Sequence, residues 1–150
     1  MFARKFHLID IENLVGMAWP SLARVRFIRD SYLRLGIFQP GDLFAIACNH
    51  GAAGAVGFGW PGGRLLRQSG KDGADLALLG VLEEEKLVDR FGHVVIASGD
   101  HIFAKPAVEL GRAGIEVTAV APPLGISRDL KVAAARTVDL FDVHGFGLAA

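Results

Sequence analysis

Three aspartates stand where carboxylates could bind a metal ion. Asp10 ends the apolar run FHLI, and Asp100 follows the apolar run VVIA within the turn SGD. Asp75 opens a segment with leucines at helical spacing, so we expect it in the first turn of a helix and on its core-facing side. Oxygen ligands without a cluster of Cys or His favour Mg²⁺ or Mn²⁺ over zinc.

Each aspartate also has an ordinary structural interpretation. Asp10 could cap the loop that follows it, Asp75 could complement the positive end of its helix dipole, and Asp100 could be a helix N-cap. Taken singly, these roles are the favoured ones. Three carboxylates converging on one end of a sheet would repel one another unless a cation lay between them, so the metal site is the better interpretation of the set.

The elements that must position these residues alternate in hydrophobic period. Short apolar runs predict strands, and three- and four-residue spacings predict helices between them. The predicted strands are 5–9, 42–48, 93–98, 115–121 and, more weakly, 64–67; the predicted helices are 21–35, 73–90, 102–112 and 127–135. This alternation indicates an α/β protein with a mainly parallel sheet in three layers, αβα. Ligands of such sheets bind beyond the carboxyl ends of the strands, where Asp10 and Asp100 fall.

Length and composition indicate one globular domain. The chain has 150 residues, 51% of them hydrophobic and 21% charged. We expect the domain to span residues 1–144, with a short tail at 145–150. No apolar run reaches the roughly 18 residues needed to span a membrane, and the N-terminal segment does not resemble a signal peptide, so we expect a soluble, cytoplasmic protein. Cys48 is the single cysteine and lies in the apolar run LFAIAC, typical of a small buried residue.

The formal net charge is zero, so attraction to nucleic acid would have to be local. Basic residues cluster in three segments: Arg24, Arg26, Arg29 and Arg34; Arg64, Arg67 and Lys71; and Arg128, Lys131 and Arg136. The second cluster directly precedes the helix that carries Asp75, so it is our choice for phosphate contacts. Exposed charges at a strand edge explain it equally well.

Residues 49–63 break the alternation with six glycines, and we expect a mobile loop there. Trp60 in this loop could stack on a base, although packing of Trp60 and Phe58 over the sheet edge is the favoured alternative. Neither a GxGxxG in a strand-to-helix setting nor a GxxxxGK[ST] motif occurs, which argues against a dinucleotide or nucleotide triphosphate site.

Three segments in order, HLIDIENL, GADLALL and VVIASGDHIFAKPAVELGRAGIEVTAV, resemble the NYN domain family, a branch of the PIN-like metal-dependent ribonucleases. The resemblance covers residues 6 to about 140. It implies a PIN-like fold in which acidic residues bind Mg²⁺ or Mn²⁺ and RNA is cleaved. Asp10, Asp75 and Asp100 match the acidic positions of the family, Asn13 matches its carboxamide, and Ser98 matches its small polar residue.

The sequence departs from the family at one position. The family often has a second acid two residues after the SGD aspartate, whereas Ile102 stands there in this chain. His101 could partly replace that acid, or it could simply face solvent. Loss of one carboxylate should weaken metal binding, so an RNA-binding or nucleotide-binding regulatory module with weak or absent catalysis is the alternative function.

The functional hypothesis is hydrolysis of RNA phosphodiester bonds at one or two divalent ions. Asp10 and Asp100 would bind metal directly, Asp75 directly or through water, and Asn13 would orient the loop or the scissile phosphate. Glu12 is left out because it faces away if the extended period continues. RNA is the expected partner, a membrane is not, and the sequence leaves open whether the protein forms a homodimer. A metal-dependent phosphatase acting on small molecules is a third hypothesis, although the sequence has no DxDxT motif.

Overall fold

The computed structural model describes residues 4–68, 73–84 and 86–141, except the side chains of residues 73–75, 84 and 88. Its centre is a six-stranded sheet in the order β3-β2-β1-β4-β5-β6, and every neighbouring pair is parallel. The strands are β1 (Lys5–Asp10), β2 (Leu43–Cys48), β3 (Arg64–Arg67), β4 (His93–Ala97), β5 (Glu116–Ala121) and β6 (Arg136–Asp139). The predicted parallel α/β architecture is therefore confirmed, while the proposed tail at 145–150 lies outside the described residues.

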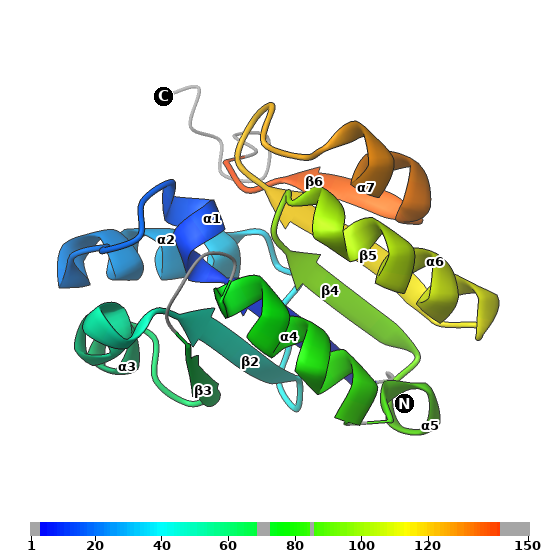
Figure 1. Ribbon diagram of the computed structural model, residues 1–150, viewed down its shortest axis with the longest axis horizontal. Helices are drawn as coiled ribbons and strands as arrows, with labels where there is room; N and C mark the ends of the chain where they lie inside the picture. The colour runs from blue at the N-terminus through cyan, green and yellow to red at the C-terminus, as the bar shows by residue number, and fades with distance from the viewer. Residues whose placement is uncertain (1–3, 69–72, 85, 142–150) are drawn as a thin grey trace.

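Helices cover both faces of the sheet (Figure 1). One face carries α4 (Gly73–Glu84), α5 (Leu87–Arg90), α6 (Ala104–Arg112) and α7 (Arg128–Ala133). The other carries α1 (Ile11–Val15), α2 (Leu22–Arg34) and α3 (Ala53–Gly59). These three layers are the predicted αβα arrangement. Within the described part of the chain, no helix is long and apolar enough to cross a membrane.

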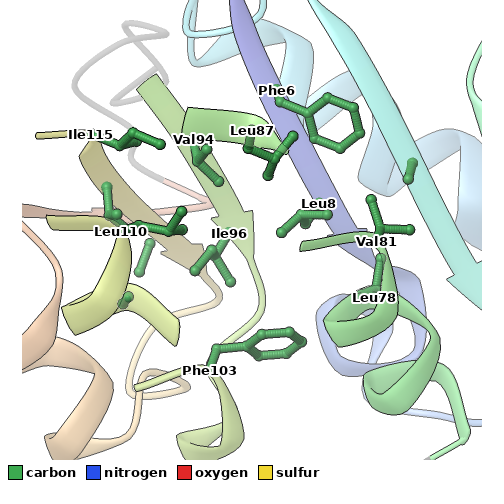
Figure 2. Close-up of a cluster of buried hydrophobic side chains, with 14 of the residues drawn as sticks. Phe6, Leu8, Leu78, Val81, Leu87, Val94, Ile96, Phe103, Leu110 and Ile115 are labelled. Atoms are coloured by element: carbon green, nitrogen blue, oxygen red, sulfur yellow. The ribbon is translucent and has the colours of Figure 1, made fainter. Parts of the chain in front are cut away.

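Alternate residues of the central strands fill the two cores. Phe6 and Leu8 of β1 pack with Val94 and Ile96 of β4 beneath α4 and α6, as Figure 2 shows. Ile9 and its neighbours on the opposite face pack against α1 and α2. A strand buried on both faces needs a continuous apolar run rather than an alternating one, which is why these segments were recognisable as core strands.

Local capping residues set several of the helix ends that the sequence predicts. The Ser21 and Ser127 side chains accept hydrogen bonds from Arg24 N and Leu130 N, so α2 and α7 begin one residue after each serine. Gly36 has φ +76° and follows the end of α2, as its glycine predicts. The predicted helix 73–90 instead divides into α4 and α5, with Lys86 between them at φ +47°.

The prediction of a loop at 49–63 was wrong. Asn49 Oδ1 accepts hydrogen bonds from Gly51 N and Ala52 N and starts a 3-10 turn, which leads into α3. A Cβ on Gly59 would lie 2.7 Å from Val25 Cγ1, so glycine permits the close approach of α3 to α2. Trp60 is only 4% exposed and packs against Tyr32 and Phe44, with ring centroids 5.5 and 5.9 Å away. The packing alternative is therefore correct for Trp60.

Two further elements, α1 and β6, were not predicted from the sequence. The helix α1 begins directly at the end of β1, where an extended chain was expected, and β6 extends the sheet beyond β5. The buried thiol of Cys48 was anticipated; burial raises its pKa to about 11.

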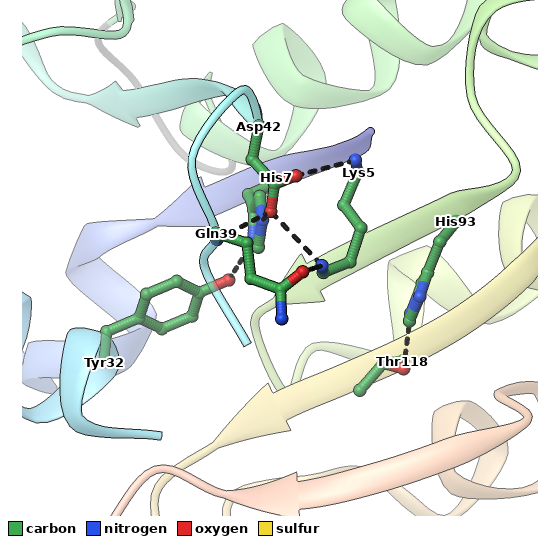
Figure 3. Close-up of polar contacts among 7 residues, drawn as sticks. All are labelled: Lys5, His7, Tyr32, Gln39, Asp42, His93 and Thr118. Atoms are coloured by element: carbon green, nitrogen blue, oxygen red, sulfur yellow. Dashed lines mark hydrogen bonds and ion pairs between the residues drawn. The ribbon is translucent and has the colours of Figure 1, made fainter. Parts of the chain in front are cut away.

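A buried polar network joins β1 to α2 and to the start of β2 (Figure 3). His7 is fully buried, with Nδ1 2.5 Å from the Tyr32 hydroxyl and Nε2 2.8 Å from Asp42 Oδ2. A carboxylate accepts only, so Nε2 carries the proton and Nδ1 accepts from Tyr32. Asp42 also accepts from the backbone N–H groups of Lys5 and Gln39. Burial opposes ionisation of Asp42, but these hydrogen bonds together lower its pKa.

This network makes the free energy of unfolding depend on pH. Burial lowers the pKa of His7 from 6.5 to about 4, so the unfolded chain binds the proton first as the pH falls. The contribution of neutral His7 is complete above pH 6.5 and is lost between pH 6.5 and 4, by about 3 kcal/mol in total. Urea unfolding of wild type and His7→Gln across this window should show a shallower pH dependence in the variant.

The matched control is His50→Gln, since that histidine is exposed on the 3-10 turn after β2. It should keep the wild-type pH dependence. An identical slope in wild type and His7→Gln would mean that other groups, such as His93, whose pKa burial also lowers, dominate the acid response.

Candidate functional site

The site lies where the order of the strands reverses. From β1 the chain proceeds to β2 and β3 on one side, and β4, β5 and β6 lie on the other. In open parallel sheets ligands bind beyond the carboxyl ends at this point. The register pairs Ile9 with Ala97, so Asp10 at the end of β1 lies beside Ser98, the first residue after β4.

Hydrogen bonds connect the segments that follow β1 and β4. Ser98 Oγ donates to Asp10 Oδ2 at 3.0 Å and accepts from Asp100 N at 3.2 Å. Asn13 Oδ1 accepts from Gly99 N at 2.9 Å, and Asn13 N donates to Asp10 Oδ1 at 3.4 Å. Asp10, Asn13, Ser98 and Asp100 were predicted as site residues from distant parts of the sequence, and the fold brings these four together.

Both carboxylates do have the capping roles considered as alternatives. Asp10 Oδ1 caps α1, and Asp100 Oδ1 accepts from Ile102 N at 3.0 Å at the start of a 3-10 turn over residues 101–103. Asp10 is 3% exposed, whereas the Asp100 side chain is 27% exposed. These hydrogen bonds fix the orientation of both carboxylates at the strand ends.

Glu12 belongs to the same end of the sheet, contrary to the prediction that it faces away. That prediction assumed a continuing strand, but the chain becomes helical at Ile11. Glu12 Oε1 accepts from Asn49 Nδ2 at 3.0 Å, and burial together with the neighbouring Asp10 carboxylate raises the pKa of Glu12. Asp10, Glu12 and Asp100, here called the acidic rim, therefore concentrate negative charge at this end of the sheet. The contribution of Glu12 could have been predicted only by recognising helix α1.

The remaining predicted acid lies largely outside the described part of the structure. The backbone of Asp75 belongs to the first turn of α4, but its side chain is not described. Among the side chains that are described, no three His, Cys, Asp or Glu residues form a group that could hold a metal ion. Asp10 and Asp100 are therefore the two predicted ligands whose side chains the structure describes.

The predicted phosphate contacts are spread apart. Arg64 and Arg67 occupy the two ends of β3 and are both exposed, but residues three apart on a strand face opposite sides of the sheet. Arg67 pairs with Cys48 at the carboxyl end, whereas Arg64 pairs with Ala45 in the middle of β2. Lys71 lies outside the described residues. His101 is 79% exposed, and its Nδ1 lies 3.3 Å from Asp100 Oδ1.

The described acids at these strand ends are of the type that Mg²⁺ and Mn²⁺ prefer, although Asp10, Glu12 and Asp100 do not by themselves form a group that could hold a metal ion. Ser98 Oγ links the Asp10 carboxylate to the backbone N–H of Asp100, and Glu12 lies near enough to Asp10 for the two charges to interact. All of these donors are carboxylate oxygens, which hard divalent cations prefer. A cation would relieve the repulsion that contributes to the raised pKa of Glu12.

At Gly99 the backbone after β4 lies very close to the backbone of the loop after β5. A Cβ there would lie 1.8 Å from the carbonyl oxygen of Gly125, and Gly99 O also accepts from Ser127 N at 2.8 Å. The backbone after β4 is therefore clamped between Asn13 on one side and the loop after β5 on the other.

Comparison with known proteins identifies the architecture alone. No protein-family model and no curated protein matches the sequence. The chain resembles the crystal structure of a protein of unknown function from Vibrio parahaemolyticus, with a TM-score of 0.61 and 15% sequence identity. The similarity covers 93% of this chain and 94% of that one, so the α/β fold extends over nearly the whole of both.

Substitution of Gly99 by alanine should destabilise the protein by about 2 kcal/mol, because the new methyl group meets backbone rather than a flexible side chain. Gly111→Ala in α6 is the control: nothing lies within 4 Å of its Cβ position, and alanine favours the helix by about 0.5 to 1 kcal/mol. Urea denaturation compares the two. Equal stability of Gly99→Ala and wild type would show that the loop at 122–127 shifts to accommodate the added methyl group at little cost.

Proposed function

We propose that this protein is a divalent-metal-dependent ribonuclease with an acidic site at the carboxyl ends of β1 and β4, as its sequence resemblance to the NYN domain family implies. The observation that carries the proposal is the cluster in which Ser98 Oγ joins Asp10 and Asp100 at the strand-order reversal. Strand tips at this reversal are where open parallel sheets bind ligands. A cytoplasmic location, where RNA is available, forms part of the same proposal.

In this mechanism Asp10, Asp100 and Asp75 would hold Mg²⁺ or Mn²⁺, and the ion would supply activation of water and stabilisation of charge on the phosphate. Ser98 fixes the orientation of Asp10 by donating to Oδ2. Asn13 ties α1 to Gly99 and keeps the two strand tips at constant separation. Arg67 is the better candidate of the two β3 arginines for a phosphate contact, because it occupies the carboxyl end of that strand.

Cleavage of a labelled single-stranded RNA should require Mg²⁺ or Mn²⁺ and stop in EDTA. Asp10→Asn and Asp100→Asn should each lower the rate by at least about 100-fold, since each removes a negative charge from the metal site. Asparagine is as good an N-cap as aspartate, so both variants keep the caps on α1 and the 3-10 turn. Loss of activity in Asp100→Asn would then reflect charge, whereas Asp10→Asn also replaces the oxygen that accepts from Ser98 Oγ, so urea unfolding of that variant accompanies the assay.

Asp129→Asn provides the matched control, because Asp129 is an exposed acid in the first turn of α7. It should cleave at the wild-type rate. Metal-independent cleavage, or equal rates in wild type and both site variants, would refute the assignment. Turnover of a generic phosphomonoester without RNA cleavage would instead indicate a phosphatase.

A second candidate function is RNA binding with weak or no catalysis, and Ile102 favours it. Ile102 is partly buried and packs against the core beneath α4 and α6, at the position where the related family often has an acid. An apolar side chain cannot bind a cation there. Binding of RNA that is insensitive to EDTA and unaccompanied by cleavage would support this function.

Introducing the missing acid tests the role of this position. Ile102→Asp should increase the affinity for Mn²⁺ about tenfold and raise the cleavage rate, at a cost in stability because an apolar contact with the core is lost. Ile102→Asn is the control, since it has nearly the same shape without the charge. Equal Mn²⁺ affinities of the two variants, measured by calorimetry, would exclude residue 102 from the site.

A further inference from the structure

A second cavity lies directly behind the acidic site. Its volume is about 380 Å³, within the usual range for small-molecule pockets, and its lining includes Asn13, Gly16, Arg24, Phe27, Gly125 and Phe141. None of the described residues that line it is acidic. Asn13 and Gly125 border it on the side of Gly99, so the cavity and the acidic rim share one wall.

Asn13 lines this cavity, and one end of its carboxamide is already engaged. Its Oδ1 accepts from Gly99 N, which fixes the orientation of the carboxamide and leaves the Nδ2 group as the free end. The described part of the protein contains no buried side-chain nitrogen or oxygen without a partner, so this group is accessible rather than sealed in the interior. An anion in the cavity would accept from it.

Arg24 supplies a positive charge at the same cavity. It is exposed on the first turn of α2, and within the described residues no ion pair or side-chain hydrogen bond engages its guanidinium group. By contrast, Arg29 on the next turn is held by Asp30 and by Gly59 O. Arg24 is therefore available to bind a phosphate group in a bidentate manner.

Phe27 supplies an aromatic surface beside these donors. Its side chain is 51% exposed although it lies on α2 beside the buried Ile28, and its ring lies 5.9 Å from that of Phe141. Exposed aromatic rings next to free cations are typical of sites that bind single-stranded nucleic acid, because bases stack on them.

We propose that this cavity is a nucleotide subsite that holds one residue of single-stranded RNA next to the bond to be cut. The base stacks on Phe27, and the phosphate accepts from Arg24 and from Asn13 Nδ2. The choice of RNA as the ligand rests on the proposed function. The anion-binding chemistry of the cavity does not, because Arg24 and Asn13 would bind a phosphate whether or not the neighbouring carboxylates bind a cation.

The test measures binding without cleavage. Anisotropy of a fluorescein-labelled RNA decamer in EDTA should show roughly 5- to 150-fold weaker binding for Phe27→Leu than for wild type, the range of one lost stacking contact. Arg24→Gln should also weaken binding and reduce the slope of log K against log salt by about 0.7. Phe58→Leu and Arg26→Gln are matched controls, because both residues are exposed and neither lines the cavity.

Backbone NMR with AMP locates the contact independently. The amide signals of Gly16 and Gly125 should shift in wild type and should not shift in Phe27→Leu.

Wild-type binding by both cavity variants would overturn the subsite, and if wild type still cleaves RNA the proposed function would stand. Absence of cleavage together with Phe27-dependent binding would support the subsite and refute the nuclease. No binding of the decamer or AMP by wild type would also overturn the subsite.

Discussion

The hydroxyl group of Ser98 holds the acidic site together. It has one proton, which it donates to Asp10, and its lone pairs accept from the backbone of Asp100. Asp10 Oδ2 is therefore the acceptor in this pair. Because Ser98 directly follows β4 and Asp10 ends β1, the bond is possible only in the observed register of these two strands. A slip of one residue in either strand would turn its side chain to the opposite face of the sheet and break the bond.

Much of the architecture was predictable because the sheet is parallel and buried on both faces. Such strands appear as apolar runs, and serine caps mark the starts of α2 and α7. The elements that escaped prediction depend on tertiary contacts. Helix α3 is rich in glycine, a poor helix former, and is stabilised by packing against α2 that glycine alone permits. The short helix α1 has only five residues, too few to show a period.

The site was predictable where it follows from strand ends and unpredictable where it follows from packing. Asp10, Asn13, Ser98 and Asp100 occur directly after apolar runs, and parallel strands bring those ends together. The cavity beside them could not be found in this way. Its walls come from α1, α2, the loop after β5 and Phe141, which are remote in sequence and meet only because helices on one face converge on the strand-order reversal.

Glu12 differs from the two capping carboxylates at these strand ends, because its surroundings oppose its charge. Capping accounts for Asp10 and Asp100. The His7 network elsewhere on β1 shows how the fold satisfies a buried polar group, because His7 lies between an acceptor, Asp42, and a donor, Tyr32. Glu12 has no such balance. Asn49 donates to it, yet burial and the charge of Asp10 still raise its pKa, so its ionised form is destabilised where it lies. In the proposed metal site, a divalent cation would offset the repulsion between these two carboxylates.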